Sequence, residues 1–366
     1  MLASLWVAVT LLVLLTVLPV WRHDRWWIRG LDFPRLQLAL LALFLVLLPW
    51  WLSPSDAGHI WAMALVSVAC FAYHAWWILP YTPLHPKEVR DAGSLSGTDR
   101  ANRIAIMTAN VLTPNRQAQR LLSLVKEHQP DILVTLESDR WWQQQLDALE
   151  TDYGYTIKCP LDNLYGMHVY SRYPLDNVAI QFLVEDDVPS MHAEVLLPSG
   201  ERIVLHCLHP APPSPTENET SSERDAELLV VGRSVAKSDS PVIVTGDLND
   251  VAWSATTRLF RKISGLLDPR IGRRMCNSFH ARVPLLRWPL DHLFHSEHFV
   301  LEELRRLPAF GSDHFPVLVR LVYRSNARPQ EGLDADREDR QWAREKMAEE
   351  AVAPGEVHRP EAAMPR

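Results

Sequence analysis

The sequence predicts an α/β domain that is preceded by three transmembrane helices. Two observations support this prediction. Residues 1–80 contain three long apolar runs, and residues 102–324 alternate short β-branched runs with segments of helical periodicity. A chain of 366 residues is long enough for one sizeable domain with a buried core in addition to a membrane segment.

The three apolar runs cover residues 2–21, 36–52 and 59–79. A helix of about 20 apolar residues crosses the hydrocarbon core of a bilayer. Tryptophan prefers the headgroup level, and the tryptophans at or just beyond the ends of the runs are Trp21, Trp26, Trp27, Trp50, Trp51, Trp76 and Trp77. A cleaved signal peptide is the alternative for the first run, but that run lacks a basic segment in front and its apolar core is too long. Residues 1–80 are therefore predicted to be an anchor in a lipid bilayer.

The loops of the anchor predict its orientation. Residues 22–35 include Arg22, Arg25, Arg29 and Arg35, whereas residues 53–58 contain neither lysine nor arginine. The positive-inside rule places the first of these loops in the cytoplasm. The amino terminus then lies outside, and everything after residue 80 lies on the cytoplasmic side.

Residues 81–101 are rich in proline, glycine, serine and charge, which is typical of a linker. The domain begins with a predicted β-α-β unit: a strand at 103–111, a helix at 115–129 and a strand at 131–137. Short β-rich segments follow up to residue 210, and predicted helices at 221–237 and 254–264 flank a strand at 242–250. Two final strands are predicted at 290–296 and 315–323. Residues 325–366 are charged and poor in aliphatic residues, so we expect a disordered tail, with a charged helix near 334–350 as a further possibility.

Composition excludes little about the partners of the domain. The net charge of −7 and the pI near 6.1 do not favour non-specific binding of nucleic acid, although a local basic patch would be sufficient for binding. The four cysteines are scattered without a CxxC pair, so we interpret them as free thiols.

Polar residues gather at the ends of the predicted strands. Asn110 follows "IAIMTA", Glu137 follows "DILVTL", and Asp247 and Asn249 follow "VIVTG". Asp291 opens a later strand, and the pair Asp313–His314 stands before the last one. Groups at strand ends of α/β folds converge on one rim of a sheet, where ligands bind. Such an oxygen-rich site suits Mg²⁺ or Mn²⁺, and histidine adds a group that exchanges protons near neutral pH.

Each of these residues also has a purely structural interpretation. Asn110 is suited to a turn, Asp250 to the N-cap of the following helix, and an isolated Asp-His pair is more often structural than catalytic. The order of all five groups along the chain favours a site.

Seven segments in order resemble the endonuclease/exonuclease/phosphatase superfamily of metal-dependent phosphoesterases. They are "TANV", "LVTLE", "YSRYPL", "LHPAPP", "GDLND", "PLDHLF" and "SDHFPV", within residues 102–323. The resemblance implies a four-layer α/β sandwich, in which two mixed sheets pack face to face with helices outside. The predicted three-helix anchor is similar to that of membrane-bound bacterial members of the superfamily. This similarity implies that the protein lies in the bacterial inner membrane.

The resemblance further implies roles for single residues. Glu137 is expected to be the main metal ligand, with Asn110 and Asp313 close to the metal. Asp247 is expected to position or deprotonate the attacking water, and Asn249 and His209 to contact the phosphate. His314, paired with Asp291, is expected to stabilise the transition state. Tyr170 of "VYSRYPL" is a possible substrate contact, and a packed strand residue is the equally supported alternative.

A histidine–cysteine group, a basic run and the function of the domain each have two interpretations. His206, Cys207 and His209 suggest zinc, but adjacent strand residues point to opposite faces. A basic run, Arg258 to Arg274, fits either a phosphate backbone or a solvated helix face. The function itself has two interpretations: a phosphoesterase acting on nucleic acid, a lipid headgroup or a small metabolite, or a catalytically silent scaffold on the same fold. No obligate protein partner is inferred.

Overall fold

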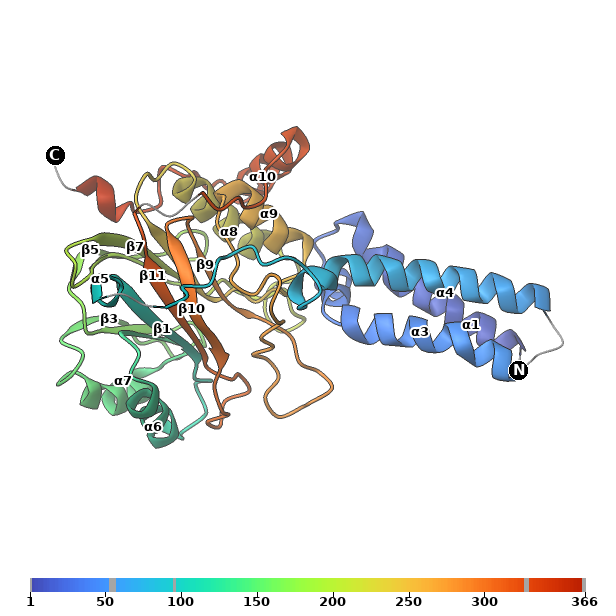
Figure 1. Cartoon of the computed structure of the whole chain (residues 1–366), viewed down its shortest axis with the longest axis horizontal. Helices are drawn as coiled ribbons and strands as arrows, with labels where there is room; N and C mark the ends of the chain where they lie inside the picture. Colours follow the sequence, from blue (N-terminus) through green and yellow to red (C-terminus); the bar gives the residue numbers. More distant parts are fainter. Residues whose placement is uncertain (1, 53–56, 95–96, 326–328, 364–366) are drawn as a thin grey trace.

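A computed structural model describes residues 2–52, 57–94, 97–325 and 329–363 of the chain. An α/β domain lies at one end of an elongated helical bundle, which is formed by residues of the predicted anchor (Figure 1). The amino terminus lies at the far end of the anchor, and the carboxyl end of the chain lies on the opposite side of the domain.

The first sheet of the domain is built around β1, which pairs in parallel with β2 and antiparallel with β11. Its strand order is β10 (Phe299–Arg306), β11 (Val317–Tyr323), β1 (Arg103–Asn110), β2 (Ile132–Leu136), β4 (Met167–Ser171) and β3 (Tyr155–Cys159). The predicted β-α-β unit is therefore present, with α6 (Ala118–His128) as its crossover helix.

The second sheet contains a parallel pair, β7 and β8, flanked by antiparallel strands. Its strand order is β5 (Leu175–Gln181), β6 (Ser190–Leu196), β7 (Arg202–Leu208), β8 (Val242–Asp247) and β9 (Asp291–His295). Both sheets are thus mixed.

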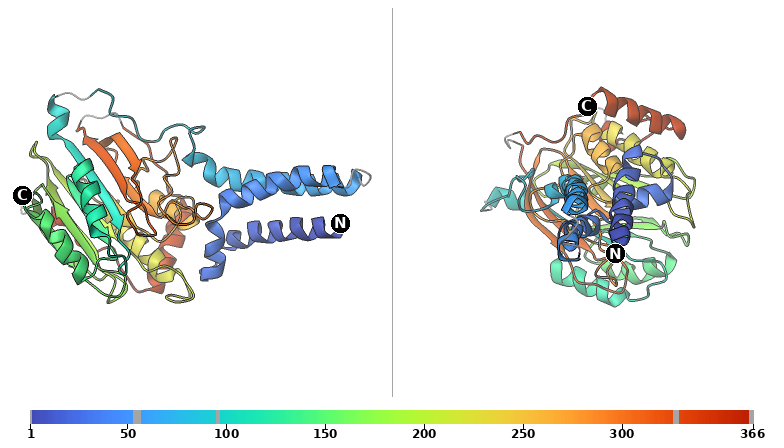
Figure 2. Two further views of the ribbon diagram at one scale, coloured as in Figure 1. Left: turned by 90° about the horizontal axis from the view of Figure 1, so that it is seen from below. Right: turned by 90° about the vertical axis from the view of Figure 1, so that its right-hand side faces the viewer.

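The two sheets pack face to face through a buried core that includes Ile104 and Ile106 of β1 and Ile243 of β8. Helix α6 packs on the outer face of the first sheet, together with α7 (Arg140–Leu146) and η4 (Asp147–Leu149). Helices α8 (Ser222–Val235) and α9 (Ala255–Ser264) pack on the outer face of the second. Figure 2 shows these layers edge on. The predicted α/β fold of two packed mixed sheets with outer helices is confirmed.

The anchor is a bundle of α1 (Leu2–Val17), α3 (Arg35–Leu52) and α4 (Ala57–Ile78), which meet through Leu12, Ala42 and Met63. Shorter helices complete the anchor and the linker: η1 (Leu18–Trp21), α2 (Trp26–Arg29), η2 (Gly30–Asp32), η3 (Leu79–Tyr81) and α5 (Gly97–Ala101). Many large apolar side chains on the outside of the bundle are exposed, among them Leu11, Leu47 and Leu65.

Two helices, Leu2–Trp21 and Ala57–Tyr81, are long and apolar enough to cross a membrane. The predicted third span, at 36–52, corresponds to α3. It meets the same criterion only together with α2 and η2, as the pair Trp26–Asp32 and Arg35–Trp51, which is bent by 67°. Residues 53–56 of the predicted second loop lie outside the described residues, as do residues 95 and 96 of the linker.

Residues 329–363 of the C-terminal segment correct the expectation of a disordered tail and contain the charged helix that was the alternative near 334–350. Residues 326–328 and 364–366 of the predicted tail lie outside the described residues. Helix α10 (Arg337–Glu349) begins at a capping box formed by Asp336 and Asp339. Ala343 and Met347, four residues apart, are buried against the α8 layer, and Lys346 Nζ lies 2.6 Å from Asp24 Oδ1. The segment ends in η5 (Pro360–Ala363). A few apolar residues on one face are sufficient for docking, and the average composition of the segment concealed them.

Candidate active site

Strand alternation brings Asn110 and Asp247 together. In β1, Ile104, Ile106 and Thr108 face the opposite sheet, and Asn110 continues this series at the carboxyl end of the strand. In β8, Ile243 and Thr245 face the first sheet, and Asp247 continues this series at the carboxyl end of the strand. The hydroxyls of Thr108 and Thr245 lie 2.8 Å apart across the two sheets. Two residues further on, Asn110 Nδ2 donates to Asp247 Oδ2 at 3.1 Å.

Gly246 allows β8 to lie this close to β7. Its φ is +151°, and a Cβ at this position would lie 1.8 Å from the carbonyl oxygen of Leu208. Only glycine fits such an approach of two backbones. The glycine before Asp247 is therefore a condition for the position of the carboxylate.

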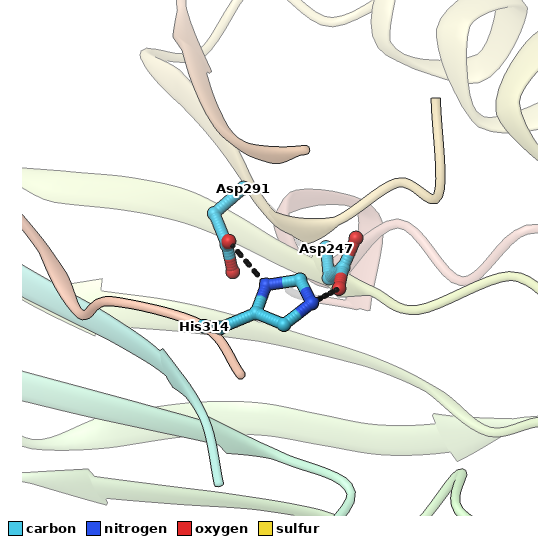
Figure 3. A group of neighbouring side chains, drawn as sticks. All are labelled: Asp247, Asp291 and His314. Atoms are coloured by element: carbon cyan, nitrogen blue, oxygen red, sulfur yellow. Dashed lines mark hydrogen bonds and ion pairs between the residues drawn. The ribbon is translucent and has the colours of Figure 1, made fainter. Parts of the chain in front are cut away.

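His314 lies between two carboxylates (Figure 3). Its Nδ1 donates to Asp291 Oδ2 at 2.8 Å, and its Nε2 lies 3.4 Å from Asp247 Oδ2. Asp291 is the β9 residue in register with Asp247 of β8, whereas His314 comes from the turn before β11 in the other sheet. All three side chains are buried, so face-to-face packing of the sheets assembles the group.

The charges of this group favour a protonated imidazole. Burial alone would lower the pKa of His314, but the carboxylates of Asp291 and Asp247 outweigh burial and raise the pKa to about 10. Burial would raise the pKa of Asp247, yet the His314 charge holds it below its usual range. Near neutral pH the pair is therefore an imidazolium and a carboxylate.

Glu137 joins the group from the end of β2. Its backbone is left-handed, with a φ of +58°, and its Oε1 accepts a hydrogen bond from Asn110 Nδ2 at 2.7 Å. Burial raises the pKa of Glu137 to about 7, with smaller contributions from the charges of Asp313 and Asp247. Its Oε2 is buried and has no hydrogen-bond partner among the described residues.

Asn249 and His209 both lie close to Asp247. Asn249 adopts a φ of +51°, its backbone N–H donates to Asp247 Oδ1 at 3.0 Å, and its Nδ2 donates to the carbonyl of Pro210 at 3.0 Å. His209 is buried, its pKa is lowered to about 4 by burial, and its Nδ1 has no partner within the described structure. A neutral imidazole with a free nitrogen is thus placed beside the ion pair.

Asp313, half-buried, lines the same cleft as Glu137 and His314. Tyr170 does not join them. It is buried in the cluster under α6 and α7, on the outer face of the sheet, and its hydroxyl donates to Asp147 Oδ1 at 3.1 Å. The prediction of a substrate contact is therefore wrong for Tyr170, and the alternative of a packed strand residue describes it.

Asp250 also differs from its expected role. The N-cap of α9 is Ser254, whose hydroxyl accepts from Thr257 N–H at 2.9 Å. Asp250 accepts from the Ser254 hydroxyl and lies 3.4 Å from Arg224 Nη2. It supports the cap from outside the helix.

The residues present fit a hard divalent cation. Asp247, Asp291 and His314 offer ligand atoms within 4.8 Å of one another. Both ring nitrogens of His314 face carboxylates, however, and a doubly protonated ring has no lone pair for a metal. The unpartnered Oε2 of Glu137 is the better candidate, because a buried carboxylate oxygen is costly unless a donor or a cation meets it.

The site opens into a cleft of about 590 Å³. The domain lines it with Glu137, Asn249, Asp313 and His314. A second wall comes from α2, η2 and the two residues before α3, and includes Trp26, Arg29 and Phe33. No motif in the sequence predicts this wall; its arginines and tryptophans indicate only the orientation and the boundary of the predicted membrane segment.

The basic run is largely neutralised inside the protein. Arg261 pairs with Glu88, Arg270 Nη2 lies 2.8 Å from Asp268 Oδ2, and Arg273 Nη2 lies 2.6 Å from Asp91 Oδ1. These contacts favour a structural role for the run over a surface that binds a phosphate backbone.

The fold agrees with the comparisons with known proteins. The model of the Endonuclease/Exonuclease/phosphatase family matches residues 107–314. No curated protein matches the sequence. Similar solved structures include a TDP2 from D. rerio in complex with a single-strand DNA product (18% identity, TM-score 0.51, covering 60% of this chain and 98% of that one).

The catalytic domain of human Nocturnin with bound sulfate has 17% identity and a TM-score of 0.51, and the match covers 61% of this chain and 95% of that one. An endonuclease/exonuclease/phosphatase from Bacteroides vulgatus has 17% identity and a TM-score of 0.50, and its match covers 61% and 99%. At these identities the likeness concerns the fold. The family model spans more than half of the chain, from β1 to His314, and the chain belongs to the Endonuclease/Exonuclease/phosphatase family.

Proposed function

We propose that the chain is a membrane-anchored phosphoesterase that hydrolyses phosphate esters with the help of Mg²⁺ or Mn²⁺. The observation that carries the proposal is the unpartnered carboxylate oxygen of Glu137 beside the hydrogen-bonded series Asn110, Asp247, His314 and Asp291. Buried groups that are this strongly shifted and lie on one cleft are typical of active sites.

Hydrolysis requires a positioned water, neutralisation of phosphate charge and support for the departing oxygen. Asp247 is the ionised carboxylate that orients the water and takes up its proton while the new bond to phosphorus forms. The Nε2–H of His314 stabilises the negative charge that develops on the phosphoryl oxygens as the bond to the leaving oxygen breaks. Asp291 holds the ring in place, and Asn249 and His209 contact the phosphate.

Glu137, Asn110 and Asp313 are the residues that would hold the metal. When bound, the cation supplies charge neutralisation at the non-bridging phosphate oxygens. Glu137 would hold such a cation through its free Oε2, which otherwise has no partner in its buried position.

Membrane anchoring rests on the two long apolar helices and on the bent third pair. We place this multi-pass protein in the bacterial inner membrane because its helices resemble those of membrane-bound bacterial members. The arginines of residues 22–35 support a cytoplasmic domain through the positive-inside rule.

A substrate panel tests the activity. Full-length protein in nanodiscs is assayed with soluble phosphodiesters and phosphomonoesters in Mg²⁺, in Mn²⁺ and in EDTA. Turnover that requires a divalent metal and disappears in Asp247→Ala supports the proposal. A zero rate with every ester at saturating metal supports the catalytically silent scaffold instead.

A further inference from the structure

We infer that the cleft opens onto the bilayer surface and that its substrate is a phosphate ester carried by a membrane lipid headgroup. The inference rests on the proposed phosphoesterase function and adds the class of substrate. It comes from the position of the cleft between the catalytic residues and the base of the anchor.

The segment that forms the second wall of the cleft joins two membrane helices. Helix α1 continues directly into η1, which ends at Trp21, and α3 begins at Arg35. Residues 22–34 therefore lie where the chain would leave and re-enter the lipid. Trp26 and Trp27 in this segment are 39% and 46% exposed. Exposed tryptophans of this kind lie at headgroup depth.

This segment is fixed to the catalytic domain by buried contacts. Arg29 Nη2 lies 3.2 Å from Asp225 Oδ2, with both side chains almost fully buried, and Trp253 Nε1 donates to the carbonyl of Asp32 at 2.9 Å. Ala39 and Tyr81 of the anchor pack with Trp253 as well. Trp253 lies only a few residues beyond Asn249, so these contacts join the segment to the chain close to the catalytic rim.

A loop before β9 also reaches the membrane boundary. Val283, Leu285 and Leu286 are 37%, 82% and 46% exposed. The carbonyl of Leu285 accepts a hydrogen bond at 2.8 Å from the side chain of Gln37, in the first turn of α3. Figure 1 shows this loop, in orange, extending from the domain on the side of the anchor. An exposed apolar loop beside the entry point of a membrane helix is suited to dipping into the lipid surface.

The chemistry of the cleft favours a lipid over a soluble polyanion. Phe33, Phe279, Leu286 and Trp288 give it largely apolar walls, and Arg29 is the single lysine or arginine among its lining residues within the described chain. A nucleic acid requires several cations along its backbone. A lipid headgroup needs one phosphate site with an apolar surface beside it. The catalytic residues supply the phosphate site and the aromatic and leucine side chains supply the apolar surface, in a cleft next to the segment that we place at headgroup depth.

The test uses full-length protein in phosphatidylcholine nanodiscs that contain phosphatidylglycerol, phosphatidylethanolamine and phosphatidic acid. Headgroup or phosphate release is followed by phosphorus NMR. Parallel arms contain glycerophosphoglycerol, which has the same phosphodiester without acyl chains, a chromogenic aryl phosphodiester, and a single-stranded oligonucleotide. Cleavage of a bilayer lipid roughly tenfold or more faster than its deacylated counterpart is expected.

Leu285→Asp supplies the matched variant, because Leu285 is exposed and does not line the cleft. The ratio of lipid rate to aryl ester rate falls roughly tenfold in this variant. Val178→Asp is the control. It introduces the same charge at a position 45% exposed on β5, at the end of the domain away from the anchor (Figure 1), and the ratio stays at the wild-type value.

The outcomes separate the two proposals. Faster cleavage of the oligonucleotide or of the deacylated ester than of any bilayer lipid overturns the lipid inference and leaves the phosphoesterase in place. An unchanged ratio in Leu285→Asp also overturns the inference. Absence of cleavage in every arm overturns the proposed function itself.

Discussion

The imidazole Nδ1 of His314 lies 2.8 Å from Oδ2 of Asp291, although Asp291 belongs to a strand of one sheet and His314 to the turn that leads into a strand of the other. Asp291 opens β9, and His314 precedes β11. The contact therefore depends on how the two sheets pack, and a carboxylate in this position keeps one ring nitrogen as a donor and turns the other towards Asp247.

Asp291→Asn should lower kcat about a hundredfold with little change in KM, because the charge that holds the imidazolium is lost while the cleft is intact. Steady-state kinetics with a soluble aryl phosphodiester measure this. Asp239→Asn, an exposed aspartate after α8, is the control and keeps the wild-type kcat. A loss confined to KM would argue against the positioning role of Asp291.

Glu137→Gln should abolish stabilisation by a divalent metal. Any ligand that binds only the folded state raises the melting temperature. Mg²⁺ or Mn²⁺ should therefore raise the melting temperature of the wild type, and the Gln variant, with a neutral amide in place of the carboxylate, should not respond. Differential scanning fluorimetry with and without metal is the measurement. An equal shift in both proteins would place the metal elsewhere.

Gly246→Ala should destabilise the fold strongly. The new Cβ meets the Leu208 carbonyl at 1.8 Å, and the backbone at φ +151° is unfavourable for alanine. We expect a loss of about 3 kcal/mol or more in the free energy of unfolding. Gly200→Ala separates the two causes, since its φ is +91° but nothing lies within 4 Å of the added atom. Its cost should be about 1 kcal/mol. Denaturant unfolding measures the free energy of unfolding of both variants. Equal losses in the two variants would contradict the steric cause proposed for Gly246→Ala.

The buried carboxyl of Glu227 should lower the free energy of unfolding at alkaline pH. This α8 carboxyl is buried, its Oε1 has no partner in the described structure, and burial raises its pKa from 4.5 to about 8. The folded state keeps a proton that the unfolded chain releases above about pH 4.5, so this contribution is complete below that pH and is lost as pH rises through 8.

Glu227→Gln should remove this dependence, because glutamine does not ionise. The variant should melt higher than the wild type at about pH 9 and close to it at about pH 4. Thermal melts across this range provide the test, and parallel curves for the two proteins would show that Glu227 does not control the effect.

The sequence predicted the domain and most of its site because strand ends are local features. Asn110, Glu137, Asp247 and Asp291 each follow or open an apolar run, and their convergence needs only the general rule that strand ends meet at a rim. The side of the sheet on which Tyr170 lies follows from strand register, which pairs Tyr170 with Leu133 under the outer helices. Register depends on two strands together, so the sequence of one strand does not predict it.

Contacts between distant segments account for what the sequence did not predict. The wall formed by Trp26 to Phe33 depends on buried contacts such as Arg29 with Asp225, nearly two hundred residues away in the chain. The docking of α10 depends on Ala343 and Met347 finding an apolar surface on α8, which composition averaged over the tail does not reveal. Both are tertiary contacts without a local signature.

The hydrolysis of a soluble phosphodiester by the wild type, Asp247→Asn and Asp152→Asn in saturating Mg²⁺ measures whether Asp247 is the catalytic carboxylate. Asp247 is buried beside His314, whereas Asp152 is exposed, so the same chemical change is made inside and outside the site. We expect turnover by the wild type and Asp152→Asn, and a loss of about a thousandfold in Asp247→Asn. Equal rates in all three folded proteins would contradict it.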